Sequence, residues 1–227
     1  MKIQNVKVIA LCVFILPFVA VNTCLFIVQY YGDLLPVGIG IGKTFPYFDG
    51  GTSISRTARN YPTSLIFKPA MLITSYLLVK YWLLNKDIIT KFLTNKKKIK
   101  IFLFFGILSA ICLALHSIFL GIKFDHDLYK FFRRFILLSF VIFEIVAQVY
   151  LVMCLYNIKN DIKNYINYNI LKLKIVLVSL VSITALISLP IVIGPGNKYF
   201  KHALEWDFFL AIILFYLLTF LMWKKEN

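Results

Sequence analysis

The polar side chains best placed for chemistry stand in the middle of an apolar stretch. Glu144 lies within FVIFEIVAQVYL (140–151), and Gln148 follows four residues later. On a helix these two residues share a face and would line one polar patch. A carboxyl group at such a depth is costly, so it either faces a wet cavity or is a protonated acid hydrogen-bonded to a neighbouring helix. His116 and Lys68 are possible partners, and a small transporter that uses Glu144 is one function that this pattern allows.

Histidine and carboxylate side chains form a second group with chemical potential. His126 is followed directly by Asp127, and His202 is followed five residues later by Asp207. Imidazole and carboxylate groups that converge can bind a metal ion and activate water. No pair has the helical spacing of a motif such as HExxH, so we expect no metal. A membrane-embedded hydrolase or acyltransferase that uses these residues is nevertheless an alternative that the sequence leaves open.

A third group combines acids with arginines. The stretch FPYFDGGTSISRTARNYP (45–62) contains one acid and two arginines, and an acid–tryptophan pair opens the last apolar segment. The residues concerned are Asp49, Arg56, Arg59, Glu205 and Trp206. Acids and arginines at one membrane surface could pair and hold the stretch as a lid, or the arginines could clamp the phosphate of a lipid headgroup. An acid beside a glycine pair is also typical of a turn, which favours a structural role for Asp49.

Membrane-spanning helices must position these groups. Apolar residues make up 60% of the 227 residues, whereas soluble domains are nearer half. A helix needs about 20 mostly apolar residues to cross a bilayer, and the apolar segments do not alternate with polar residues as barrel strands would. We therefore expect an all-α membrane protein with a single domain (1–227). Its six expected transmembrane helices are 6–30, 63–84, 99–122, 133–156, 171–193 and 205–223.

The charged residues predict how these helices are oriented. Fourteen lysines fall on one side of the expected membrane, against nine lysines and arginines on the other. Since cytoplasmic loops carry the excess of positive charge, we expect both termini in the cytoplasm and a lid-like first extracytoplasmic loop at residues 31–62. No loop is long enough to hold a nucleic-acid-reading element, so we expect no nucleic-acid partner. The lysines expected to face an anionic cytoplasmic leaflet are Lys96, Lys97, Lys98 and Lys100.

Cysteine and glycine patterns argue against two further classes of site. The cysteines all fall inside expected helices, which favours free buried thiols over a disulfide framework or a loop zinc site. They are Cys12, Cys24, Cys112 and Cys154. The stretch GIGIGKT (38–44) is preceded by Val37, where a phosphate-binding loop needs glycine, so we expect no cofactor.

The first long loop and the last apolar segment together resemble the Frag1/DRAM/Sfk1 family of multi-pass membrane proteins. Members have a first helix and then an extracytoplasmic loop with a pattern like P-Y-I-S-D-x-G. Four or five further helices follow, and a Glu-Trp opens the final helix, with a Thr-Phe further along. The matching residues are Pro46, Tyr47, Asp49, Gly50 or Gly51, Glu205, Trp206, Thr219 and Phe220. No serine precedes Asp49, and two arginines stand in the region where many relatives have a Pro-Glu pair.

This resemblance implies a role linked to lipids. Family roles include the remodelling of lipids that bear GPI anchors or ceramide, the control of lipid distribution, and functions related to autophagy. Catalysis is not a property of the family as a whole. We therefore expect a factor that binds, remodels or distributes membrane lipids, in a membrane that the sequence does not identify.

Overall fold

The computed structural model describes residues 2–34, 40–93, 96–122 and 127–224. Within these ranges the regular structure is helical, apart from one isolated bridge between Ile166 and Trp223. Three short helices follow the first long one: η1 (Gly32–Leu34), α2 (Pro46–Asp49) and α3 (Ile54–Ala58). The long helices are α1 (Lys2–Tyr31), α4 (Thr63–Ile89), α5 (Lys96–Phe119), α6 (Asp127–Asn157), α7 (Tyr168–Ile193) and α8 (Lys198–Met222).

Five of the long helices are long and apolar enough to cross a membrane, which agrees with an integral membrane protein of the multi-pass type. They lie within Ile3–Leu34, Lys96–Phe119, Phe131–Asn157, Tyr168–Ile193 and Lys198–Met222. The expected span 63–84 lies in α4, which has 27 residues but is not among the five. This helix contains Lys68, Lys80, Lys86 and Asp87, whose charges lower its hydropathy.

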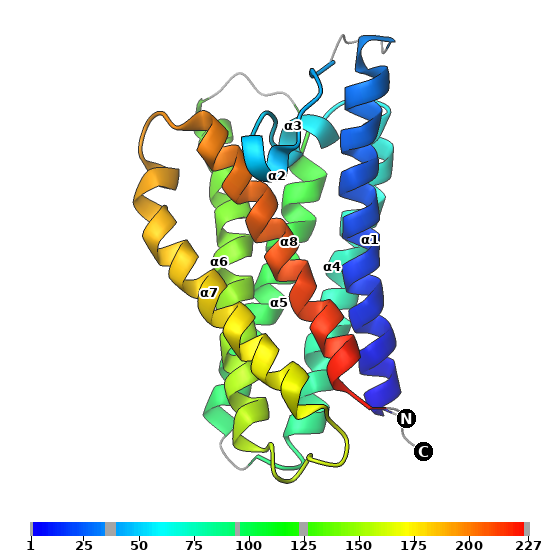
Figure 1. Cartoon of the computed structure of the whole chain (residues 1–227), viewed down its shortest axis with the longest axis vertical. Coiled ribbons are helices and arrows are strands. Elements are labelled where there is room, and N and C mark those ends of the chain that lie inside the picture. The colour runs from blue at the N-terminus through cyan, green and yellow to red at the C-terminus, as the bar shows by residue number, and fades with distance from the viewer. Residues whose placement is uncertain (1, 35–39, 94–95, 123–126, 225–227) are drawn as a thin grey trace.

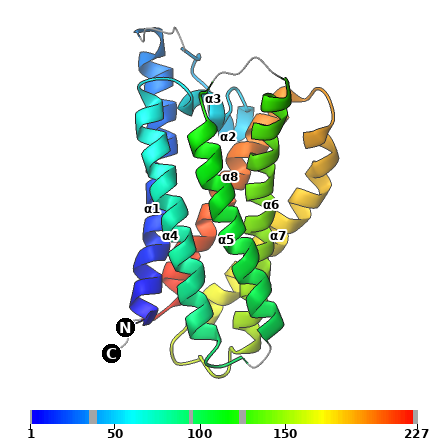
Figure 2. The same cartoon turned by 180° about the vertical axis from the view of Figure 1, so that it is seen from behind.

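The long helices form one bundle in which α8 is central. Figure 2 shows α4, α5 and α6 side by side, with α1 next to α4. In Figure 1, α8 crosses the opposite face of the bundle diagonally, and it contacts α1, α6 and α7. The outermost helix is α7: only 17% of its most apolar 18-residue stretch is buried against the rest of the protein. Residues on α8 can therefore reach side chains from most other helices.

The two ends of the bundle differ in what covers them. The start of α1 and the end of α8 lie at the same end, which we call the terminal end (Figure 1). There Lys224 N donates to Tyr165 O at 2.9 Å, so the chain beyond α8 pairs with the α6–α7 connection. The short helices α2 and α3 lie at the opposite end, which we call the cap end (Figure 1).

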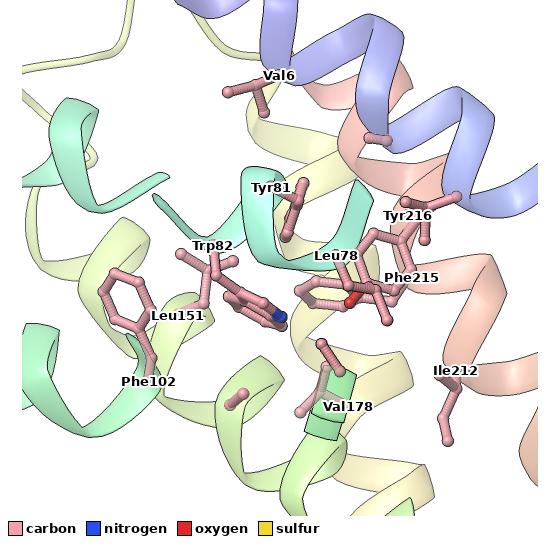
Figure 3. Packing of buried hydrophobic residues seen from close by; sticks show 14 of the residues in the cluster. Val6, Leu78, Tyr81, Trp82, Phe102, Leu151, Val178, Ile212, Phe215 and Tyr216 are labelled. Carbon is pink, nitrogen blue, oxygen red and sulfur yellow. The ribbon is translucent and has the colours of Figure 1, made fainter. Parts of the chain in front are cut away.

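Aromatic side chains fill the centre of the bundle, where α4, α5 and α8 meet. Tyr81 and Trp82 of α4 are fully buried, and their rings lie 5.1 Å apart (Figure 3). The ring of Tyr81 also packs on that of Tyr216, with 4.9 Å between centroids. A Cβ on Gly106 would lie 2.5 Å from the Trp82 indole, so α5 can pass this close only with glycine there.

The observed helix ends place some of the functional candidates differently from the sequence-based boundaries. Helix α8 begins at Lys198, seven residues before the expected span, so His202 lies on a helix rather than in a connector. Helix α5 begins at Lys96, and the run of four lysines occupies its first turns. The lengths of the apolar segments alone cannot locate such ends, because a helix can continue through charged residues beyond its apolar part.

Candidate functional site

The segment 44–62, which we call the cap, folds through local turn chemistry. Pro46 starts α2, and Gly50 ends it in the left-handed conformation with φ of 60°. Ser53 caps α3 by accepting from Arg56 N. The backbone of the cap is thereby ordered by residues that need no partner from the bundle.

Asp49 holds the cap together from within. Its carboxylate accepts from Thr44 Oγ1, from Phe45 N at 2.8 Å and from Gly51 N at 2.8 Å. The Thr44 hydroxyl, followed by the N–H groups of Gly51 and Phe45, lowers the pKa of Asp49 because each stabilises the charged form. Both carboxylate oxygens are therefore occupied by the turn around them, as expected for a turn-forming acid.

The cap packs onto the first turns of α8. His202 Nδ1 donates to Gly50 O at 3.0 Å, and Trp206 Nε1 donates to Thr52 O at 2.8 Å. The ring of Tyr47 lies edge-on to the buried Trp206, with 4.9 Å between centroids. The two stretches that carry the family resemblance thus meet in space, although about 150 residues separate them.

Glu205 lies one turn of helix from His202 and faces the cap. Its Oε1 accepts weakly from Ser55 N at 3.3 Å and from Ser55 Oγ at 3.5 Å. Asp49 and Glu205 are at the same end of the bundle, but Asp49 bonds only its own turn. Arg56 and Arg59 are exposed on and just after α3, on the same side as Glu205. The five residues of the expected headgroup pocket therefore gather at the cap end without forming one hydrogen-bonded cluster.

The histidine and acid groups do not form a metal site within the part of the chain that is described. No group of three or more potential metal ligands is found among those residues. His202 bonds the Gly50 carbonyl, and Asp207 is exposed on α8. His126 lies outside the described residues, and Asp127 begins α6. The four cysteines are free thiols, three of them buried.

Glu144 and Gln148 do lie together, in a network that joins three helices. Gln148 Nε2 donates to Glu144 Oε1 at 3.2 Å and to Ile212 O at 3.3 Å. Tyr216 of α8 donates to the same carboxyl oxygen, and Ser109 of α5 lies 2.6 Å from the other. His116 and Lys68, the partners suggested by the sequence, are not in this network; Lys68 Nζ instead donates to the backbone carbonyl of residue 118.

Counting protons gives the ionisation state of Glu144. Ser109 Oγ lies 2.8 Å from Gly106 O as well as 2.6 Å from Glu144 Oε2. The Ser109 hydroxyl has one proton, which it donates to Gly106 O because a carbonyl oxygen only accepts. The contact with Glu144 is then a hydrogen bond only if the carboxyl group is protonated and donates to Ser109. The carboxyl group is then neutral, as its complete burial in an apolar bundle requires.

Lys174 forms a second buried polar contact nearer the terminal end. The side chain is fully buried, and Nζ donates to Thr219 Oγ1 at 2.7 Å and lies 3.8 Å from the centre of the Phe215 ring. Thr219 donates to Phe215 O, so it accepts from Tyr81 as well as from Lys174. Lys174 is one of the fourteen lysines that the sequence assigns to the cytoplasmic side, but its amine points into the bundle and not into solvent.

Sequence reasoning missed the residues whose roles depend on packing between helices. Lys174 follows the exposed Lys172 by two residues, so both looked like interfacial charges. The signal was present in the spacing, because buried positions on α7 recur at 171, 174, 178 and 181, and Lys174 falls in this stripe. Ser109 and Tyr216 carried no such signal, since hydroxyls are common in apolar helices.

Comparison with known proteins adds no relative to these observations. No protein-family model matches the chain, and neither the curated proteins nor the solved structures contain a significant match.

Proposed function

We propose that the chain crosses the membrane six times, with both termini in the cytoplasm. In this proposal α4 crosses the membrane in addition to the five helices that are apolar enough by composition. An even number of crossings is supported by the shared end of the start of α1 and the end of α8 (Figure 1). Lys68 and Lys80 lie near the two ends of the expected span 63–84 within α4, where lysines can extend to the interface. The basic start of α5 then faces the anionic cytoplasmic leaflet, and the cap faces outwards.

We further propose that this protein binds a membrane lipid by its headgroup beneath the cap, as a lipid-remodelling or lipid-distribution factor of the Frag1/DRAM/Sfk1 type. The observation that carries this proposal is the packing of Tyr47 on Trp206 and of Ser55 on Glu205. Both family-like stretches thereby build one surface at the membrane interface. A headgroup is the ligand that this position and the exposed arginines suit.

In this proposal the cap acts as a lid. It has its own internal hydrogen bonds. It is attached to α8 by contacts of Gly50, Thr52, Tyr47 and Ser55, and to α1 by Tyr47 Oη, which donates to Asn22 Oδ1. A segment with its own internal hydrogen bonds can open as a unit without unfolding the bundle. Opening would expose Glu205 and Trp206 to a lipid in the outer leaflet.

Native mass spectrometry of gently purified protein tests the proposal. We expect the wild-type chain to carry a lipid with a defined headgroup. Gly50→Ala detaches the cap and should lose that lipid, whereas Gly42→Ala, at a position with open space for a methyl group, should keep it. A wild-type chain without bound lipid, or equal lipid content in both variants, would count against the proposal.

A small transporter is the second candidate, because Glu144 and Lys174 are two ionisable groups fully buried in the bundle. Such groups often mark ion or proton paths in membrane proteins. Transport by reconstituted protein that stops on Glu144→Gln would support this function. Transport that is insensitive to the substitution would remove it.

A further inference from the structure

Arginines from two separate elements meet around the end of α5. Arg59 follows α3 and lies against the turn after α5, where a Cβ on Gly121 would be 2.6 Å from Arg59 O and 3.7 Å from Arg59 Cγ. Arg133 of α6 stacks on Tyr129, with 5.5 Å from Cζ to the ring centre. Tyr129 in turn donates to Phe119 O at 2.8 Å, so both arginines flank the last turn of α5.

The charges of this cluster act on one another. Partial burial lowers the pKa of Arg59, the positive charges of Arg133 and Arg56 lower it further, and Glu205 opposes them. Arg59 thus lies within the field of two other guanidinium groups and of one carboxyl group. Arginine stays protonated in proteins, so such a cluster calls for an anion.

Two nitrogens of the cluster are buried without a hydrogen-bond partner in the described structure. They are Arg133 Nε and His116 Nδ1. His116 is only 7% exposed and lies one turn before the end of α5, next to the arginines. Buried polar atoms in native proteins nearly always have partners. Thr52 Oγ1, Trp82 Nε1 and Trp223 Nε1 are also buried without one in the described structure, but only Arg133 and His116 belong to side chains that carry or can take up positive charge.

The surroundings of the cluster separate a lipid from a soluble anion. Phe131 and Phe135, on the same helix as Arg133, are 66% and 58% exposed, and Leu128 is 79% exposed. Arg133 lies at the start of the apolar span 131–157, where hydrocarbon meets headgroups. A phosphate there would have acyl chains beside it, and the exposed apolar side chains would contact those chains.

We propose that Arg59, Arg133 and His116, with Arg56 at the rim, form a binding site for the phosphate of an anionic phospholipid at the cap end. The inference rests on the proposed lipid function and names the headgroup chemistry that function would use. Guanidinium groups hold phosphate oxygens through two parallel N–H donors. Arg133 Nε supplies one donor that is otherwise unused, and His116 Nδ1 supplies a second in the tautomer that carries its proton on that nitrogen.

Lys68, which lies near the site, has an ordinary hydrogen-bond partner and needs no ligand. Lys68 Nζ donates to the backbone carbonyl of residue 118, which satisfies the end of α5 in the ordinary way. Arg59 and Arg133 make no such contact in the described ranges, and the Nε of Arg133 is left over. A site for an anion accounts for this difference.

Native mass spectrometry with added lipids tests the site on the full chain. The probes are dioleoyl phosphatidylglycerol, phosphatidylcholine and diacylglycerol, which share acyl chains but differ in phosphate and net charge, and inorganic phosphate as the soluble anion. We expect wild type to bind phosphatidylglycerol about tenfold more tightly than diacylglycerol. Inorganic phosphate at millimolar concentration should compete weakly. If inorganic phosphate instead displaces the lipid fully, the site takes the free anion and the lipid assignment is overturned.

Substitutions then locate the binding. Arg59→Gln with Arg133→Gln should lower phosphatidylglycerol affinity about tenfold and leave diacylglycerol binding unchanged. The matched control is Lys43→Gln with Arg134→Gln, which removes the same net charge from exposed residues of the cap end. A wild type that binds none of the lipids overturns the proposed function and the site together. Wild type that binds all lipids equally, or an arginine variant that keeps the phosphatidylglycerol preference, overturns the phosphate site alone. The wild-type lipid series decides the matter even if the double variant fails to fold.

Discussion

In the middle of the bundle, the polar protons around Glu144 all find acceptors. Tyr216, Gln148 and Ser109 surround the carboxyl group, and Gln148 uses its second N–H on a backbone carbonyl. At the cap end, Arg133 Nε and His116 Nδ1 find none. A satisfied network adds rigidity and needs nothing further. An unsatisfied one is where a ligand can supply the missing hydrogen-bond partners.

The most damaging change we predict is in the satisfied network. Glu144→Ala removes the acceptor of Tyr216 and the partners of Gln148 and Ser109, and should cost about 3 kcal/mol. Glu144→Gln should be nearly neutral, because an amide can donate to Ser109 and accept from Tyr216 as the neutral acid does. Apparent melting temperatures in detergent measure both. If Glu144→Gln were as damaging as Glu144→Ala, the carboxyl group would be charged in the native protein.

Helix count and the pairing of Glu144 with Gln148 were within reach of the sequence, because apolar length and the four-residue helical repeat are local properties. The partners of Glu144 were not, since Ser109 and Tyr216 lie 35 and 72 residues away and meet it only through packing. For the same reason, the sequence did not predict that the Lys174 amine points into the bundle or that Arg133 lies close to Arg59. The six-span count and the orientation stay predictions.

Gly50→Ala should release the cap and leave the bundle folded. A methyl group there would lie 1.8 Å from Tyr199 O, at a φ of 60° that disfavours side chains, and we expect a local cost of about 2 kcal/mol. Labelling of a cysteine introduced at Ser55 should become about tenfold faster. The melting temperature should stay within a few degrees of wild type. A parallel fall in bundle stability would show that the cap and the bundle unfold together.

Lys174 is a buried polar residue whose replacement should change stability little, in contrast to that of Glu144. Among the described residues, the amine has one hydrogen bond, to Thr219, and one aromatic contact, with Phe215, so its burial is poorly compensated. Lys174→Met keeps the length of the side chain, and stability should change by no more than about 1 kcal/mol, in either direction. Exposed Lys172→Met serves as the control. A loss comparable with that of Glu144→Ala would place Lys174 inside the essential network.

The smallest effect we predict is the response of the cap to pH. Because the pKa of Asp49 is lowered in the folded cap, its contribution is fully present above the unfolded value of about 4 and is lost as the pH falls through the folded value. Labelling of the cysteine at position 55, divided by the labelling rate of a small free thiol at the same pH because only the thiolate reacts, should therefore rise below about pH 4. Asp49→Asn should label faster at neutral pH and show a flatter pH profile. A profile unchanged by Asp49→Asn would assign the response to another group.

Lipid binding by Glu144→Gln and by the Arg59→Gln, Arg133→Gln variant, measured side by side, tests the division of roles between the two regions most directly. Glu144→Gln should bind phosphatidylglycerol within about twofold of wild type, while the arginine variant should lose about tenfold in affinity. The reverse result, with binding lost on Glu144→Gln and kept without the two arginines, would contradict the account, because the ligand would then belong to the middle of the bundle.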